Sequence, residues 1–342
     1  MTQTKHVEFA NFTCKFGEKL SMLDLFDKVI LPSFEARKYK REIRDSEYFI
    51  IDTCLIKREA DDGTPYIGLS GKIVKNTKLK RDQIFREDKG IIEDHDELES
   101  APTSMFVLIL NNHRLIYVKE ISGAPGIEAF KATCSKFIGL QHKWFINKLY
   151  EDHKSARKEN QNLEPLSKKR LIQKFPYPNL RITPLTDKKG LKEFVAQFDK
   201  IDDLVIKLLP TNNEDINNDD FWNQLGDTRE KMHSKNAVVT FSNRKDGLDS
   251  DEVFDQCKTA SSMANSYIKL KGFGDHGGTL KGNNDDFNLS IDIDDLSKNV
   301  KVAGPGLIAS FLHLFNTGTI QLPDMTEIIS EKIQDIVNRF FK

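Results

Sequence analysis

The stretch MFVLILNNHRLIYV, residues 105–118, decides the fold class. It holds two apolar runs, 105–110 and 115–118, on either side of Asn111-Asn112-His113-Arg114, whose residues tolerate tight turns. The pattern predicts an antiparallel β-hairpin. Because the first run is almost entirely apolar instead of alternating, we expect this strand to be buried on both faces. The hairpin is therefore predicted to lie in the protein core.

The sequence before this hairpin predicts a second one. Residues 48–56 and 66–74 are rich in aromatic and β-branched side chains, and Asp61-Asp62-Gly63 between them is typical of a turn. The acidic run 93–99 is expected to be a solvated loop. After residue 118 the apolar period changes to 3.6, which predicts a long helix from Gly126 to about Tyr150. These elements define a first α+β domain, residues 1–150.

The rest of the chain is predicted to form a linker and a second domain. Residues 151–178 contain few apolar side chains, many charges and three prolines, a composition typical of a linker. In residues 179–342 we expect strands at 180–185, 204–209 and 237–242, helices at 187–198, 219–233 and 251–265, a hairpin of strands 266–271 and 287–293, and a terminal amphipathic helix. The predicted fold class is α+β, with two mixed α/β domains that contain antiparallel hairpins and are joined by the basic linker.

Composition limits the class of protein. The chain carries 51 Lys and Arg against 52 Asp and Glu, a net charge of -1, so any basic surface must be local. Four dispersed cysteines without a CxxC pair argue against a disulfide scaffold and a cysteine-rich zinc site. The first residues lack the apolar region of a signal peptide, and the most apolar stretch, 306–315, is much shorter than the roughly 20 residues of a membrane-spanning helix. We therefore expect a cytoplasmic protein without direct membrane insertion.

Two motifs would carry chemistry only in a specific structural setting. Gly272, Gly274 and Gly277 form a literal GxGxxG after a predicted strand, but turn formers follow instead of the helix that a dinucleotide site needs, so we expect a flexible hairpin tip. Asp292 and Asp294 share one face of a predicted strand and could hold Mg²⁺ for a nuclease, or form the solvated face of that strand. The common catalytic motifs are absent, and no cofactor is expected.

Positive charge is concentrated in two stretches. Residues 151–192 hold eleven Lys and Arg against five Asp and Glu, whereas residues 202–255 hold six against thirteen. Cations at this density can neutralise phosphates and give sequence-independent, salt-sensitive DNA binding. The alternatives are a solvated linker or an intramolecular match to the acidic segment. The residues predicted to bind nucleic acid are Lys168, Lys169, Arg170, Lys174 and Arg181 in the first stretch, and Lys72, Lys75, Lys78, Lys80 and Arg81 in a second stretch after the first hairpin.

The order of these elements resembles a known family. The segments 66–74 (YIGLSGKIV), 105–117 (MFVLILNNHRLIY), 203–207 (DLVIK) and 263–278 (MANSYIKLKGFGDHGG) are similar to the family of the phage-lambda exclusion protein RexA and to related uncharacterised bacterial families. The resemblance implies a two-domain, dimeric, cytoplasmic protein of phage defence that binds DNA as a sensor and signals to a partner such as a membrane effector. It implies no enzyme activity, and the matching strands and turns transfer no functional residue.

Three functions remain as hypotheses. The first is a non-enzymatic sensor of an antiphage or abortive-infection system, which binds double-stranded DNA without sequence preference. The second is a metal-dependent nuclease effector that uses carboxylates such as Asp292. The third is a protein-interaction subunit with no nucleic-acid role. Salt-sensitive DNA binding, metal-dependent cleavage and capture of a protein partner, respectively, distinguish them.

Overall fold

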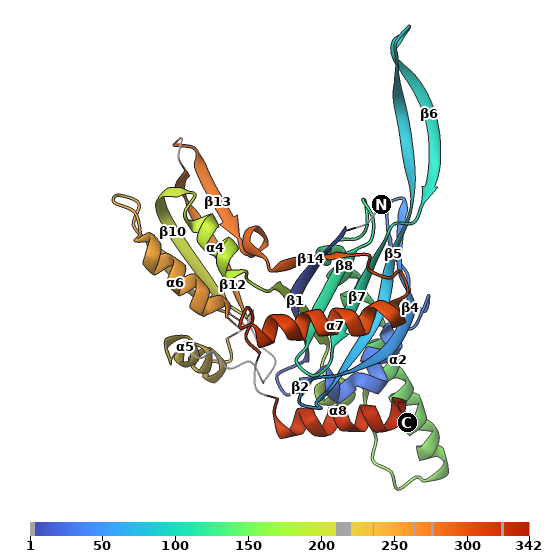
Figure 1. The fold of residues 1–342 in the computed structure, drawn as a ribbon. Helices are drawn as coiled ribbons and strands as arrows, with labels where there is room; N and C mark the ends of the chain where they lie inside the picture. Colours follow the sequence, from blue (N-terminus) through green and yellow to red (C-terminus); the bar gives the residue numbers. More distant parts are fainter. Residues whose placement is uncertain are drawn as a thin grey trace.

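The computed structural model describes residues 4–209, 220–234, 236–262, 265–274, 277–322 and 325–341. In these residues the strands form a 10-stranded sheet and a 4-stranded sheet with antiparallel pairing, and helices pack on both sheets (Figure 1). The predicted α+β fold class is confirmed.

The large sheet is organised around β1. Its main order is β14-β1-β8-β7-β5-β4-β3, with β2 and β9 also paired to β1 and β6 paired to β5. The strands are β1 (Thr4–Phe16), β2 (Leu20–Ser21), β3 (Arg41–Ile43), β4 (Ser46–Glu59), β5 (Pro65–Arg86), β6 (Gly90–Ser100), β7 (Thr103–Ile109), β8 (Arg114–Lys119), β9 (Pro178–Pro184) and β14 (Ser290–Asp294). Both hairpins predicted from residues 48–118 are confirmed, because β4 pairs with β5 and β7 pairs with β8.

Helices cover both faces of the large sheet. On one face lie the short η1 (Leu23–Leu25), η2 (Phe26–Ile30) and α1 (Leu31–Ser33), together with α2 (Ile127–Glu159), α3 (Lys168–Lys174) and α8 (Glu327–Phe340). On the other face, α7 (Val300–Asn316) packs Leu307 and Phe311 against the sheet. Because both faces are covered, residues 105–110 are buried throughout, as their apolar run predicts. Among the helices of the described residues, none combines the length and the apolar character that a membrane crossing needs.

The small sheet has its own core. Its strand order is β11-β10-β12-β13, formed by β10 (Phe198–Leu208), β11 (Ala237–Ser242), β12 (Ser266–Gly274) and β13 (Thr279–Asn283). The helices of this part are α4 (Lys188–Val195), α5 (Asp220–Lys231), α6 (Ser250–Ser261) and the short η3 (Asn284–Phe287). Trp222, Cys257 and Phe287 are buried with the sheet residues in a third hydrophobic cluster.

Strand pairing crosses the predicted linker. β9 and β14 both pair with β1, although they follow residue 150 in the sequence. The predicted hairpin of 266–271 with 287–293 is therefore wrong in its second strand, because β12 pairs with β13 and residues 290–294 join the large sheet. Residues 151–178 contain the end of α2 and all of α3. The predicted boundaries 1–150, 151–178 and 179–342 thus do not coincide with the two sheets, since local patterns do not encode pairing between distant strands.

Part of the β5–β6 hairpin extends beyond the sheet as an arm, residues 78–99 (Figure 1). The acidic run 93–99, predicted as a loop, instead belongs to β6. Its carboxylates meet cations of β5: the Lys78 and Glu97 side chains are 2.9 Å apart, and Arg81 Nη2 is 2.7 Å from Asp94 Oδ2. Cross-strand pairs of opposite charge favour pairing, which explains why a charged run becomes a strand here.

Candidate nucleic-acid interface

The second half of α2 and all of α3 present an exposed basic surface. Along α2, Phe137, His142 and Phe145 are buried against the large sheet, so the opposite side of the helix faces solvent. α3 begins after Ser167, whose hydroxyl accepts a hydrogen bond from the backbone N–H of Arg170 (3.2 Å). We call the following exposed residues the α2–α3 surface: Lys143, Trp144, Lys148, Lys168, Lys169, Arg170 and Lys174.

Cations of the α2–α3 surface contact neutral groups. Lys168 Nζ donates a hydrogen bond to Asn147 Oδ1 (2.7 Å) and lies 5.1 Å from the centre of the Tyr150 ring. Lys148 Nζ lies 5.2 Å from the centre of the Trp144 ring. Within the part of the chain that the structure describes, no cation of this surface is within 4.0 Å of a carboxylate. A phosphate can therefore bind these cations without first breaking an ion pair.

The α2–α3 surface contains four of the ten predicted residues: Lys168, Lys169, Arg170 and Lys174. Sequence reasoning missed Lys143, Trp144 and Lys148 on α2. A usable signal existed, because these residues lie on the polar side of the 3.6-residue period that predicts the helix.

The second predicted stretch presents cations that are mostly paired. Lys72 is buried, and its Nζ lies 2.7 Å from Glu120 Oε1. Lys75 is half-buried on β5. Three further residues contact carboxylates of β6 or Asp45: Lys78, Lys80 and Arg81. Lys72 and Lys75 lie where β5 pairs within the sheet, and the other three residues lie on the arm, which points away from α2 (Figure 1), so the structure does not bring the two predicted stretches together.

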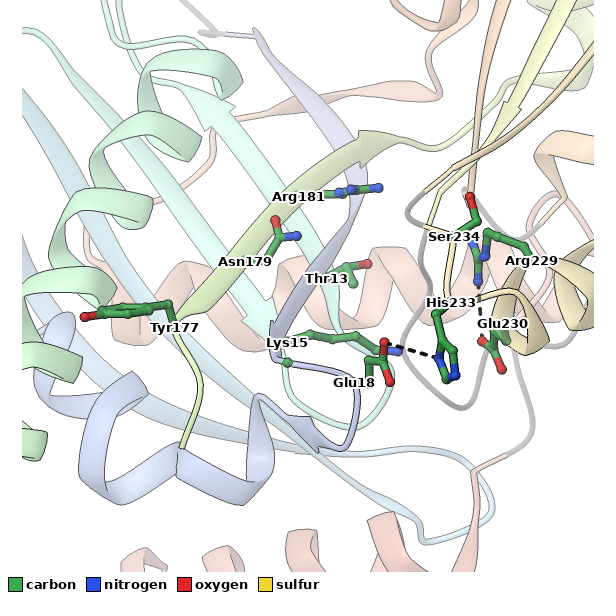
Figure 2. A pocket seen from close by; sticks show the side chains of 11 residues that line it. Thr13, Lys15, Glu18, Tyr177, Asn179, Arg181, Arg229, Glu230, His233 and Ser234 are labelled. Carbon is green, nitrogen blue, oxygen red and sulfur yellow. Dashed lines mark hydrogen bonds and ion pairs between the residues drawn. The ribbon is translucent and has the colours of Figure 1, made fainter. Parts of the chain in front are cut away.

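The tenth predicted residue, Arg181, lines a cavity of about 720 Å³ between the large sheet and α5 (Figure 2). Across the β1–β9 pair, Thr13 is opposite Arg181 and Lys15 is opposite Asn179. The intervening residues of β1 fill the core, and because side chains alternate along a strand, these four side chains face the cavity. The end of α5 and the turn after it supply the facing wall, formed by Arg229, Glu230, His233 and Ser234.

The cavity brings the charges of two arginines close together. Arg229 is 7% exposed; it donates a hydrogen bond to the backbone oxygen of Leu209, and its Nη2 lies 3.4 Å from Glu230 Oε1. Arg181 is half-buried, and among the described residues its Nη1 has no hydrogen-bond partner. Burial, and then the charge of Arg229, lower the pKa of the Arg181 guanidinium. Two like charges at a partly buried wall favour the binding of an anion.

Tyr177 lies between the cavity and α2. Its side chain lines the cavity, and its ring centre is 5.4 Å from that of His142 on α2. The His142 ring is also stacked on Phe16, with 5.9 Å between ring centres. The His142 ring therefore packs between Phe16 of the large sheet and Tyr177 at the edge of the cavity.

We expect His142 to make the protein less stable in acid. Its Nε2 lies 2.9 Å from the carbonyl oxygen of Phe175, its Nδ1 has no partner among the described residues, and burial lowers its pKa below the ordinary value. As the pH falls through about 6.5, His142 of the unfolded chain is protonated, whereas the buried His142 of the folded chain stays neutral to lower pH. Protonation therefore favours the unfolded chain, and the folded protein loses stability as the pH falls. In urea denaturation across this range, His142→Gln should flatten the pH dependence. The control is His95→Gln on the exposed face of β6, and equal flattening in both variants would contradict the assignment.

Asp292 and Asp294, the carboxylates considered for a nuclease, are exposed on β14. Asp292 Oδ1 lies 3.0 Å from His6 Nδ1, and Asp294 Oδ1 accepts a hydrogen bond from Thr4 Oγ1 (2.6 Å). Across the residues that the structure describes, no group of three or more His, Cys, Asp or Glu side chains is placed to hold a metal ion.

Residues 23–300 match the family described as a domain of unknown function, DUF4747. This match covers most of the chain, from η1 to the start of α7, and the chain belongs to this family. A comparison with curated proteins finds no match.

Proposed function

We propose that the protein binds double-stranded DNA without sequence preference through the α2–α3 surface, and that it does so as a non-enzymatic sensor. The observation that carries this proposal is a group of exposed cations held by amide and aromatic groups. Phosphates replace such contacts readily, and the release of counterions from DNA then supplies the affinity. Backbone contacts of this kind fix no base sequence.

The biological setting of the proposal is antiphage defence. It rests on the sequence resemblance to the exclusion-protein family. From the same resemblance we propose that the protein forms a homodimer and signals to an effector protein. We further propose a cytoplasmic location, which four free cysteines support because thiols stay reduced there.

The test is a DNA mobility shift across a salt series with a matched pair of triple variants. Lys168→Ala/Lys169→Ala/Arg170→Ala removes cations that have no carboxylate within 4.0 Å in the described residues, whereas Lys78→Ala/Lys80→Ala/Arg81→Ala removes the same number from ion pairs of the arm. We expect the first variant to bind more weakly, and its plot of log K against log salt to be flatter by about 0.9 for each phosphate that it no longer neutralises. The arm variant should retain the wild-type affinity.

Two outcomes would contradict the proposal. Equal weakening in both variants would indicate a diffuse charge effect, and wild-type binding by the first variant would move the interface away from α3. The same reactions with Mg²⁺ or Mn²⁺ test the nuclease alternative. We expect the DNA to stay intact, and cleavage that Asp292→Asn abolishes would overturn the non-enzymatic assignment.

A further inference from the structure

We propose that the cavity lined by Arg181 and Arg229 binds the terminal phosphate of a nucleotide, either free or at the end of a nucleic-acid strand. Binding of a phosphate at the end of a nucleic-acid strand rests on the proposed function, whereas binding of a free nucleotide does not. The cavity is separate from the α2–α3 surface in its residues and lies on the other side of Tyr177 from α2 (Figure 2).

Among the described residues that line the cavity, the cations Lys15, Arg181 and Arg229 outnumber the carboxylates Glu18 and Glu230. Arg229 is almost fully buried, and the one carboxylate within 4.0 Å of it in the described residues is Glu230, 3.4 Å away on a side chain that is 66% exposed. Arg181 has no carboxylate within 4.0 Å in those residues. Burying the guanidinium group of Arg229 and part of that of Arg181 is costly unless an anion compensates their charge. A phosphate offers oxygens that match the fork of N–H donors on each guanidinium.

The charge of the two arginines favours one kind of phosphate. A terminal phosphate carries a charge of about -1.5 to -2 near neutral pH, whereas a backbone phosphodiester carries about -1. Two arginines are therefore better matched by a terminal phosphate. Opposite Arg181, Thr13 adds a hydroxyl, and Asn179 adds an amide two positions along the same face of β9. Both groups can donate hydrogen bonds to phosphate oxygens.

The size and shape of the cavity suit a whole nucleotide. A volume of about 720 Å³ lies within the range of small-molecule sites and leaves room for a sugar and base beside the phosphate. Tyr177, 63% exposed, lines the cavity on the side of α2, and aromatic rings can stack on any base. The sheet wall is rigid because β1 pairs with strands on both sides.

Calorimetric titration of the whole 342-residue chain tests the proposal. The small probes are adenosine 5′-monophosphate, adenosine and inorganic phosphate, and the strand probes are one short oligonucleotide with a 5′-phosphate or a 5′-hydroxyl. We expect Arg181→Gln to weaken binding of a phosphorylated probe by about tenfold or more, because the charged, bidentate hydrogen bonds of the guanidinium are removed. Adenosine without phosphate should not bind measurably.

A second variant protects the test against misfolding. Asn179 is exposed, so Asn179→Asp should fold normally while placing a negative charge on the same strand face as Arg181. It should also weaken binding of phosphorylated probes. The α3 triple variant should bind adenosine monophosphate as the wild type does while losing DNA affinity, so failure of the proposed function and failure of this inference give different results.

The outcomes identify the source or overturn the site. Binding of adenosine monophosphate that falls in the Arg181 and Asn179 variants supports a free nucleotide. A 5′-phosphate preference that both variants abolish, without binding of the mononucleotide, supports a strand end. The inference is overturned when no phosphorylated probe binds, or when binding is unchanged in folded Arg181→Gln and Asn179→Asp proteins.

Discussion

Replacing Lys72 with methionine is expected to lower the free energy of unfolding by about 3–5 kcal/mol, the cost of leaving one member of a buried ion pair without its partner. Lys72 Nζ lies 2.7 Å from Glu120 Oε1, and the two side chains are 11% and 10% exposed. Thr103 donates a hydrogen bond to the other carboxylate oxygen of Glu120. Once the ammonium group is removed, this hydroxyl is the hydrogen-bond partner left to the buried Glu120 carboxylate among the described residues, and the nearby Lys5 ammonium donates to the backbone oxygen of Glu120. Urea denaturation followed by circular dichroism measures the loss.

The control is a second substitution that removes the orphaned charge. Lys72→Met/Glu120→Leu should recover much of the lost stability, because two apolar side chains of similar size can replace a buried pair at little cost. Lys78→Met on the exposed arm should scarcely move the denaturation midpoint, since surface pairs contribute little. If the double variant is less stable than Lys72→Met, the stability lost in Lys72→Met does not come from the unpaired charge of Glu120.

This ion pair also shows where a charge count along the sequence fails. The spacing of Lys72, Lys78 and Arg81 predicts a basic stretch, but it does not reveal which carboxylates lie opposite each residue. Lys72 meets a residue 48 positions away, and the arm cations meet β6. Most cations of this stretch pair within the chain, but their partners are Glu120, Asp45 and the acidic run 93–99, not the acidic segment 202–255 that the alternative named.

Elements determined by local patterns are predictable from the sequence. The 105–118 hairpin follows from two apolar runs around a turn, and the helix that begins at Ile127 follows from its 3.6-residue period. The cations of α3 are also predictable from the sequence, because a short segment rich in charged residues is expected to be exposed. These features required no knowledge of distant residues.

The cavity, in contrast, depends on contacts between residues that are far apart in the sequence. Thr13 and Arg181 are neighbours only because β9 crosses back to pair with β1, and Arg229 reaches them only because α5 ends beside that pair. Each of these placements depends on long-range packing that the sequence pattern does not show. The cluster therefore becomes visible only in the folded chain.

Gly272→Ala is expected to lower the free energy of unfolding by about 3 kcal/mol, at the upper end of the usual cost of overpacking. A Cβ at this position would lie inside van der Waals contact with the backbone oxygen of Lys200 and 2.9 Å from the Cα of Ile201. Both atoms belong to β10, which pairs with β12 and has a register irregularity next to Ile201. Backbone atoms of a paired strand cannot move aside as a flexible side chain can, so the sheet itself must shift.

The same substitution at Gly278 is the matched control. The comparison tests whether Gly272 of the GxGxxG pattern is required for close packing of two strands. In the described residues, chain neighbours apart, no atom lies within 4 Å of a Cβ built on Gly278, so Gly278→Ala should leave the denaturation midpoint unchanged. Gly277 has a positive φ of 67°, a conformation that favours glycine, and β13 begins at Thr279 without an intervening helix. Close strand approach at Gly272 and the positive φ at Gly277 thus account for these two glycines next to the paired strands β12 and β13. Equal destabilisation by Gly272→Ala and Gly278→Ala would contradict this explanation, because only the first glycine faces the backbone of a neighbouring strand.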